Sequence, residues 1–138
     1  MGEKQNEEIA RRTVEAWNAG DWELLKALYS PEIEVVAPKE WPEGGTFNSW
    51  EAVRRQFERL KDSWSEERYA IDTVRSAGDK VLVVGRWLGR GETSGLDLDL
   101  QTCLVYTIAD DRVVRIEYYL DENDARRALG GEAGSVQG

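Results

Sequence analysis

The sequence predicts an α+β domain in which an antiparallel sheet packs its helices against one face. Helical patterns dominate the chain before residue 65, whereas strand-like alternation of apolar and polar residues dominates residues 68–120. Short turn signals separate the later strands, so neighbouring strands should run antiparallel. The 138 residues suit one domain, which we assign to residues 1–129, and the Gly- and Ser-containing end at 130–138 is expected to be disordered.

Two helices are predicted at the N-terminus. Apolar residues follow helical spacing over residues 5–19, and Gly20 favours the left-handed conformation that often ends a helix. Asp21 can cap a second helix over residues 22–29, because its carboxylate accepts hydrogen bonds from the free N–H groups of a first turn. Residues 32–37 then form a first short strand.

The middle of the chain contains a predicted loop and a predicted helix. Residues 39–47 carry the turn signals of a loop, and Trp41 inside it either covers a pocket mouth or packs on the base of the loop. Asn48 followed by Glu51 matches a capping box, which opens a helix that ends near residue 64.

The rest of the chain predicts four strands and a last helical turn. Asp121 or Asn123 can cap the final turn, which runs through Leu129. The strands are expected at residues 68–76, 80–90, 96–108 and 113–120.

The last two strands form a hairpin, and the loop between them decides which residues face inward. A loop of two or four residues around Asp110 and Asp111 sets Val105 opposite Ile116, and we prefer it. A three-residue loop would instead bring the leucines of the first strand onto the Ile116 face. With the even loop, the inward face comprises Gln101, Cys103, Val105, Thr107, Val114, Ile116, Tyr118 and Leu120.

The opposite face of this hairpin carries Leu100, Leu104 and Tyr106, which is too apolar for contact with water. An apolar face of this kind indicates a partner subunit.

The composition excludes several classes of function. Lys and Arg number 18 against 27 Asp and Glu, and the formal charge of −9 repels the phosphates of nucleic acids. No apolar run spans a bilayer and no secretion leader is visible, so a cytoplasmic protein with no membrane partner is expected. One cysteine and no histidine argue against a disulfide, the usual zinc sites and Ser-His-Asp chemistry. We expect neither metal nor cofactor.

Six aromatic residues are candidates for the lining of a ligand pocket. Six tryptophans in 138 residues is heavy use, and such side chains can enclose a flat hydrophobic molecule. Aromatic residues at helix and strand spacing also serve as ordinary core, so both interpretations stay open. The candidates are Trp17, Trp41, Phe57, Trp64, Trp87 and Tyr118.

Polar candidates lie on the predicted inward face of the hairpin. Gln101 and Cys103 would join the ligand-binding set, although Cys103 also suits a small buried apolar position. Tyr118 can donate a hydrogen bond to a carbonyl, and Asp99 can move a proton. Alternatively, Tyr118 bonds a backbone group or water, and Asp99 lies in solvent at the rim.

Several short motifs resemble those of a known family. They are AWNAGD at residues 16–21, PEGGTF at 42–47, GDKV at 78–81, DRVVRI at 111–116 and YLD at 119–121. Together with the order of elements, they resemble the SnoaL-like branch of the nuclear transport factor 2-like superfamily over nearly the whole chain. These motifs mark turns and strand starts, so they are more specific for fold than for chemistry.

The resemblance implies a cone in which a strongly curved, mostly antiparallel sheet wraps the N-terminal helices around a pocket. Members of the superfamily include polyketide cyclases, ketosteroid isomerases, limonene epoxide hydrolases and non-enzymatic domains. They are often homodimers that pair through the outer face of the sheet, so the resemblance implies a homodimer through the face that carries Leu104 and Tyr106. At the positions of the three catalytic isomerase residues this chain has Thr13, Cys103 and Ala37, and the late-strand aspartate of the hydrolases falls at Tyr118. Both chemistries therefore look absent. Asp99 is the candidate for the pocket carboxylate of the cyclases.

Three functions stay open from the sequence. The first is a cofactor-independent cyclase or isomerase, in which Tyr118 and Asp99 catalyse acid/base isomerisation or cyclisation of a hydrophobic, ketone-bearing substrate. The second is a non-catalytic domain that binds a small hydrophobic molecule in the same pocket. The third is a dimerisation module whose cavity is filled by its own tryptophans.

Overall fold

The computed structural model describes residues 2–38, 45–91 and 97–130, which form a six-stranded curved sheet with helices on both sides. This architecture confirms the α+β class predicted from the sequence. The helices are α1 (Gly2–Ala19), α2 (Trp22–Leu28), α3 (Trp50–Asp62) and α4 (Glu122–Leu129). The strands are β1 (Tyr29–Ala37), β2 (Gly45–Asn48), β3 (Trp64–Ala77), β4 (Lys80–Gly91), β5 (Asp97–Ala109) and β6 (Arg112–Tyr119).

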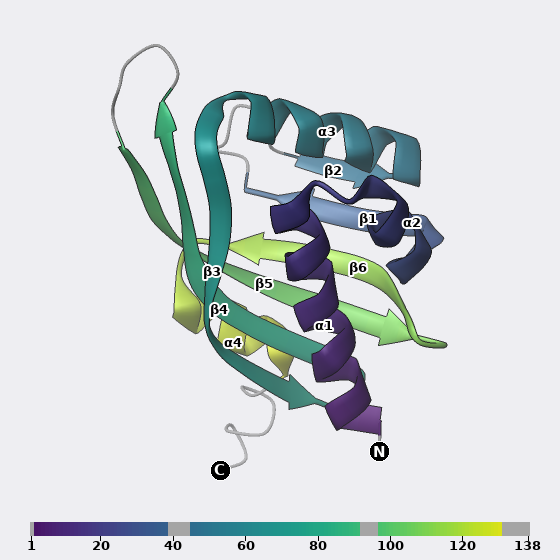
Figure 1. The fold of residues 1–138 in the computed structure, drawn as a ribbon. Coiled ribbons are helices and arrows are strands. Elements are labelled where there is room, and N and C mark those ends of the chain that lie inside the picture. Colours follow the sequence, from purple (N-terminus) through teal and green to yellow (C-terminus); the bar gives the residue numbers. More distant parts are fainter. Residues whose placement is uncertain (1, 39–44, 92–96, 131–138) are drawn as a thin grey trace.

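The helices divide between the two faces of the sheet. Figure 1 shows α1 crossing the side of the sheet that the curvature encloses, whereas α4 lies on the other side of β4 and β5. None of the described helices is long and apolar enough to cross a membrane. The expected tail at 130–138 is described only at Gly130, the C-cap of α4, and the rest of it lies outside the described residues.

The N-terminal helices end as their sequence predicts. Gly20 has a φ of +67°, the left-handed conformation expected after α1. The Asp21 side chain accepts a hydrogen bond from the N–H of Leu24 at 3.1 Å and so caps α2. The second helix is one residue shorter than predicted, because Tyr29 already has extended backbone and begins β1.

Two local predictions between β1 and α3 were wrong. The last three residues of the predicted loop, 45–47, belong to β2, which pairs with β1 so that Phe47 lies opposite Val35, and the rest of that loop lies outside the described residues. The helix cap is Ser49, whose hydroxyl accepts from the N–H of Ala52 at 3.3 Å, because Asn48 is already committed to the β1–β2 ladder. The residue that caps α3 is therefore one position later than predicted.

The sheet has the order β2-β1-β6-β5-β4-β3, in which β1 and β6 run parallel and every other described pair is antiparallel. Long strands β3, β4 and β5 bend around α1 (Figure 1). Register shifts in β3, between Ser65 and Arg68 and between Ile71 and Thr73, mark bulges of the type that bends a strand. The bulges help to close the sheet into the predicted cone.

The β5 half of the predicted inward face was wrong, whereas Ile116 and Tyr118 of β6 face inward as predicted and the preferred loop length was right. Asp110 and Asp111 both have positive φ, of 54° and 63°, and form the preferred two-residue turn. Ile108 pairs with Val113 but Thr107 pairs with Arg115, so Val114 is an extra residue in β6. This bulge shifts the register by one residue and exchanges the faces.

As a result, Leu104 lies opposite Tyr118 and Tyr106 opposite Ile116, and this face points into the cone. The surface that we expected to contact a partner subunit, Leu104 and Tyr106, is therefore interior core. On the other side of β5, Cys103 and Val105 form a second apolar cluster that α4 covers.

Candidate functional site

A cavity of about 50 Å³ lies inside the cone, between α1, α3 and the concave face of the sheet. One water needs roughly 10–15 Å³ of such space, so the cavity holds about three to five waters. Pockets that enclose drug-sized ligands are larger, roughly 300–1,000 Å³. The described residues that line it are Thr13, Val14, Trp17, Tyr29, Phe57, Leu60, Tyr69, Trp87, Thr102, Leu104, Tyr106 and Tyr118.

The periodicity of each element places these side chains on one side. Thr13 and Trp17 are four residues apart on α1, so both lie on the helix face that meets the sheet. Thr102, Leu104 and Tyr106 alternate along β5 and therefore share its inward face. The cavity thus forms where the inward faces of helices and strands meet.

Aromatic rings pack edge to face around the cavity. The ring centroids of Trp17 and Phe57 lie 4.9 Å apart, and those of Tyr29 and Phe57 lie 6.4 Å apart. Trp50 contacts Tyr29 from the outer side at 5.8 Å. Edge-to-face contacts of this kind fix ring orientation and stabilise the wall.

Most of the hydroxyl groups around the cavity donate their proton to an acceptor within the protein. Tyr69 donates to the backbone oxygen of Thr102 at 2.5 Å. The Thr13 hydroxyl lies 2.7 Å from the carbonyl oxygen of Ala10 and 2.7 Å from the Tyr106 hydroxyl. A carbonyl only accepts and Thr13 has one proton, so Thr13 donates to Ala10 and Tyr106 donates to Thr13.

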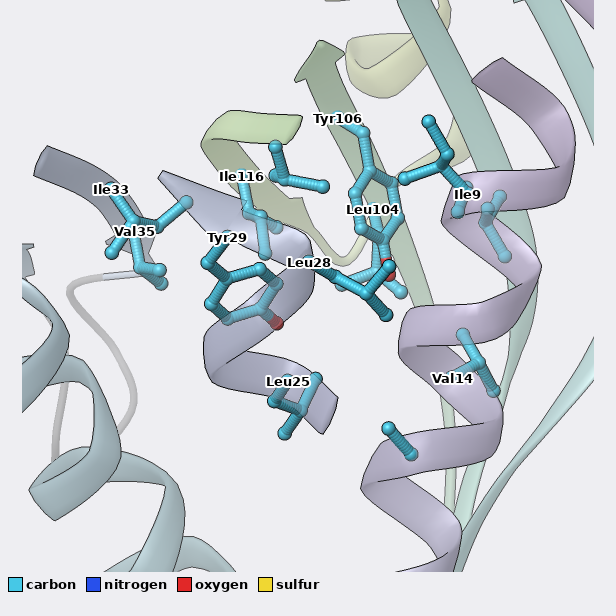
Figure 2. Close-up of a cluster of buried hydrophobic side chains, with 14 of the residues drawn as sticks. Ile9, Val14, Leu25, Leu28, Tyr29, Ile33, Val35, Leu104, Tyr106 and Ile116 are labelled. Atoms are coloured by element: carbon cyan, nitrogen blue, oxygen red, sulfur yellow. The ribbon is translucent and has the colours of Figure 1, made fainter. Parts of the chain in front are cut away.

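Tyr29 is different from these residues. Its side chain lines the cavity and the residue is only 4% exposed, yet its hydroxyl makes no hydrogen bond within the described part of the chain. Figure 2 shows the rings of Tyr29 and Tyr106 within the same cluster of buried side chains, with Leu28 and Leu104 drawn between them. Tyr29 therefore offers an unused O–H donor inside an apolar cavity.

Burial keeps these phenols protonated. Burial raises the pKa of Tyr106 to about 12, and the hydrogen bond with Thr13 offsets part of that effect. The pKa values of Tyr29, Tyr69 and Tyr118 are also raised, first by burial and then by neighbouring ionisable groups. At neutral pH the cavity therefore contains neutral phenols, which donate hydrogen bonds but do not act as bases.

A buried carboxylate lies directly behind the aromatic wall. The side chain of Glu67 on β3 is 3% exposed. Its Oε2 accepts the indole N–H groups of Trp17 at 2.5 Å and Trp87 at 2.7 Å. Its Oε1 accepts from the ammonium of Lys61 at 2.5 Å. The same ammonium donates to the backbone oxygen of Trp17 and lies 4.5 Å from the centroid of the Trp17 ring.

Four of the aromatic residues predicted from the sequence line the cavity: Trp17, Phe57, Trp87 and Tyr118. Trp64 packs edge to face on Trp87, with centroids 6.2 Å apart, and does not line it. Trp41 lies outside the described residues. The ligand-binding roles themselves stay predictions.

The structure does not bring the predicted polar set together. Asp99, Gln101 and Cys103 lie on the face of β5 turned away from the cavity, because the β6 bulge exchanges the faces. Asp99 is exposed and forms an ion pair with Arg86 at 2.5 Å. Asp99 and Tyr118, proposed from the sequence to act as a pair, therefore lie on opposite sides of the sheet.

Sequence reasoning missed three polar residues of this region: Tyr29, Tyr106 and Glu67. Tyr29 was placed at the end of a helix, and Tyr106 was assigned to the outer face. Glu67 carries no sequence signal, because it follows other polar residues just before the predicted strand. Only the packing of α1 and β4 beside it shows that it is buried.

The sequence comparison identifies the family. The model of the SnoaL-like domain matches residues 10–116. A search of the curated proteins finds no match to the sequence.

Solved structures show the same fold. Bal32a from a soil-derived mobile gene cassette is 24% identical with a TM-score of 0.81, covering 94% of this chain and 98% of that one. A protein of Jannaschia sp. CCS1, provisionally named a SnoaL-like polyketide cyclase, is 20% identical, with a TM-score of 0.77 and 93% coverage of both chains. TerC, co-crystallised with polyporic acid, is 21% identical with a TM-score of 0.76, covering 91% and 97%. The chain therefore belongs to the SnoaL-like family and has the nuclear transport factor 2-like fold.

Proposed function

We propose that this protein binds a small, mostly apolar molecule that carries one oxygen acceptor, such as a cyclic ketone. The observation that carries this proposal is the Tyr29 hydroxyl, which is buried at the cavity without a partner in the described chain. The Tyr29 side chain lines the cavity, so a ligand oxygen placed there could accept this proton in place of water.

The other contacts of the cavity favour the same class of ligand. The wall is mainly aromatic and aliphatic, so it favours an apolar body. The protons of Tyr69 and Tyr106 are used within the protein, and both indole N–H groups of Trp17 and Trp87 are bound to Glu67. Tyr29 is thus the donor that is left for a ligand among these five residues.

Acid/base isomerisation or cyclisation of such a ketone is a second candidate function. Tyr29 would polarise the carbonyl oxygen, as a buried phenol can. Proton transfer from carbon also needs a base within hydrogen-bond reach of the substrate. None of the described residues that line the cavity is a carboxylate, and for this reason we favour binding over catalysis.

The test compares indanone with indane, which has nearly the same shape but no oxygen. Binding is followed by tryptophan fluorescence, since Trp17 and Trp87 line the cavity. The wild-type protein should prefer indanone. In Tyr29→Phe that preference should fall about five- to tenfold, the effect of one hydrogen bond, while indane binding stays the same.

Tyr119→Phe is the matched control, because Tyr119 lies on the outer face and bonds Glu117. It should keep the wild-type preference. Tyr29→Phe should also leave thermal stability nearly unchanged, since the hydroxyl that it removes makes no hydrogen bond to a described residue. An equal preference for indanone in Tyr29→Phe and wild type would refute the role of Tyr29, and no binding of either compound would refute the proposed function.

A further inference from the structure

Glu67 occupies an irregular part of β3 that directs its side chain inward. Ser65 pairs with Arg90 and Arg68 with Leu88, so two residues of β3 lie within a register shift. Glu66, inside this shift, has a φ of +54°, which is unfavourable for a residue with a side chain. Bulges often re-aim a side chain, and backbone strain is concentrated at functional sites.

One oxygen of Glu67 connects two opposite walls of the cavity. Trp17 belongs to α1 and Trp87 to β4, and both indoles donate to Oε2. Hydrogen bonds to an ionised carboxylate are about twice as strong as those between neutral groups. Each indole ring is therefore held in one orientation, and neither can turn away without losing its acceptor.

Lys61 supplies the counter-charge for the buried carboxylate of Glu67. Its ammonium neutralises Glu67 and also bonds the end of α1 through the backbone oxygen of Trp17. An unpaired buried carboxylate would be protonated or would destabilise the fold. The pair therefore places a positive charge beside the two oxygens of Glu67, one of which accepts from both indoles.

We propose that Glu67 determines ligand size, because it fixes the separation of Trp17 and Trp87 and so keeps the cavity small. The proposal rests on the function proposed above. Glu67 does not line the cavity and acts through the two indoles, so it is a positioning residue. Weakening this arrangement should let the indoles move apart and admit a larger ring system.

The test measures a ratio of affinities in the full-length protein. The probes are indanone, with two fused rings, and fluorenone, with three. The wild-type protein should bind indanone more tightly than fluorenone. In Glu67→Gln one amide oxygen must serve both indoles without charge, and this preference should fall about tenfold, which corresponds to the loss of a charge-assisted hydrogen bond.

A second variant separates this effect from a general loss of stability. Trp87→Phe keeps an aromatic wall and the Glu67–Lys61 pair but removes one of the two indole donors, so it should shift the ratio in the same direction. Glu58→Gln is the matched control, because Glu58 lies on the exposed side of α3 and pairs with Arg54. Its ratio should equal that of wild type.

A purely structural role for Glu67 predicts a lower melting temperature with an unchanged ratio of affinities. An unchanged ratio in both Glu67→Gln and Trp87→Phe would thus overturn the size proposal and leave the proposed function standing. No binding of either probe to the wild-type protein would overturn both.

Discussion

The buried hydroxyl groups of this protein differ in whether another group of the protein accepts their proton. Thr13, Tyr69 and Tyr106 have partners inside the protein, whereas Tyr29 has none within the described residues. The Tyr29 side chain lines the cavity, so its hydroxyl marks the place where a ligand or water would bind. The same reasoning explains why Glu67, with three donors around it, has a mainly positional role.

Cys103 offers a prediction at the residue scale. It is fully buried beneath α4, and burial together with the carboxylates of Glu122 and Asp121 raises its pKa from 9.0 to about 11. Thiol reagents should therefore react slowly with the native protein and rapidly with the urea-unfolded protein. The measurement is the rate of labelling at pH 8 to pH 9, a window below the folded pKa.

The same pKa shift predicts a pH dependence of stability. Because the folded state holds the thiol proton more tightly, the unfolded state loses it first as pH rises. The contribution of Cys103 is therefore fully present below about pH 9 and is lost progressively toward pH 11. Melting temperatures should fall less steeply over this range in Cys103→Ala than in wild type, and parallel curves would contradict the assignment.

At the scale of elements, one bulge in β6 determines which side chains of β5 face the cavity. The extra residue Val114 brings Leu104 and Tyr106 into the cone and turns Cys103 outward. Without it, the two-residue turn would have given the face predicted from the sequence. α4 is the second deciding element, because it covers the apolar patch that the bulge turns outward.

The position of α4 predicts that detaching this helix from the sheet would leave ligand binding unchanged. Ala125 is fully buried against Cys103 and Val105, so Ala125→Asp would place an unpaired carboxylate in an apolar contact. We expect α4 to detach and Cys103 labelling to accelerate at least about tenfold, as in local unfolding. Indanone binding should not change, because the cavity lies on the other side of the sheet.

Arg127→Gln is the control for that experiment, since Arg127 lies at the surface of α4 and pairs with Asp124. It should leave both the labelling rate and the binding near wild type. Continued protection of Cys103 in Ala125→Asp would mean that α4 does not control access to the thiol.

At the scale of the whole molecule, the homodimer stays a prediction, and it needs a surface other than the one first expected. Beyond α4, the outer face of β1 and β6 carries an alternating network in which Arg115 bonds both Glu34 and Glu117. Mixed charges can be self-complementary across a two-fold axis. We therefore expect a dimer through this face that dissociates as salt rises.

Sedimentation velocity at low and high salt measures the salt dependence of dimer formation directly. Arg115→Glu should weaken the dimer at least about tenfold, because it reverses the central charge of the network. Arg127→Glu, on the exposed side of α4, is the control and should leave association unchanged. A monomer at every salt concentration would contradict the expected dimer.

The sequence by itself determined the element order, the end of α1 at Gly20, the Asp21 cap and the two-residue turn at Asp110 and Asp111. These features depend on local backbone preference and on periodicity, which are properties of neighbouring residues. The aromatic residues Trp17, Phe57, Trp87 and Tyr118 were lining candidates because of their residue type, since aromatic side chains can enclose a flat hydrophobic molecule.

Only the tertiary structure decided which polar groups reach the cavity. The Val114 bulge depends on how β5 and β6 curve around α1, and no local residue pattern marks it. The burial of Glu67 depends on three separate elements, which supply Trp17, Lys61 and Trp87. A carboxylate becomes a buried acceptor through contacts that are distant in sequence, so the fold alone reveals it.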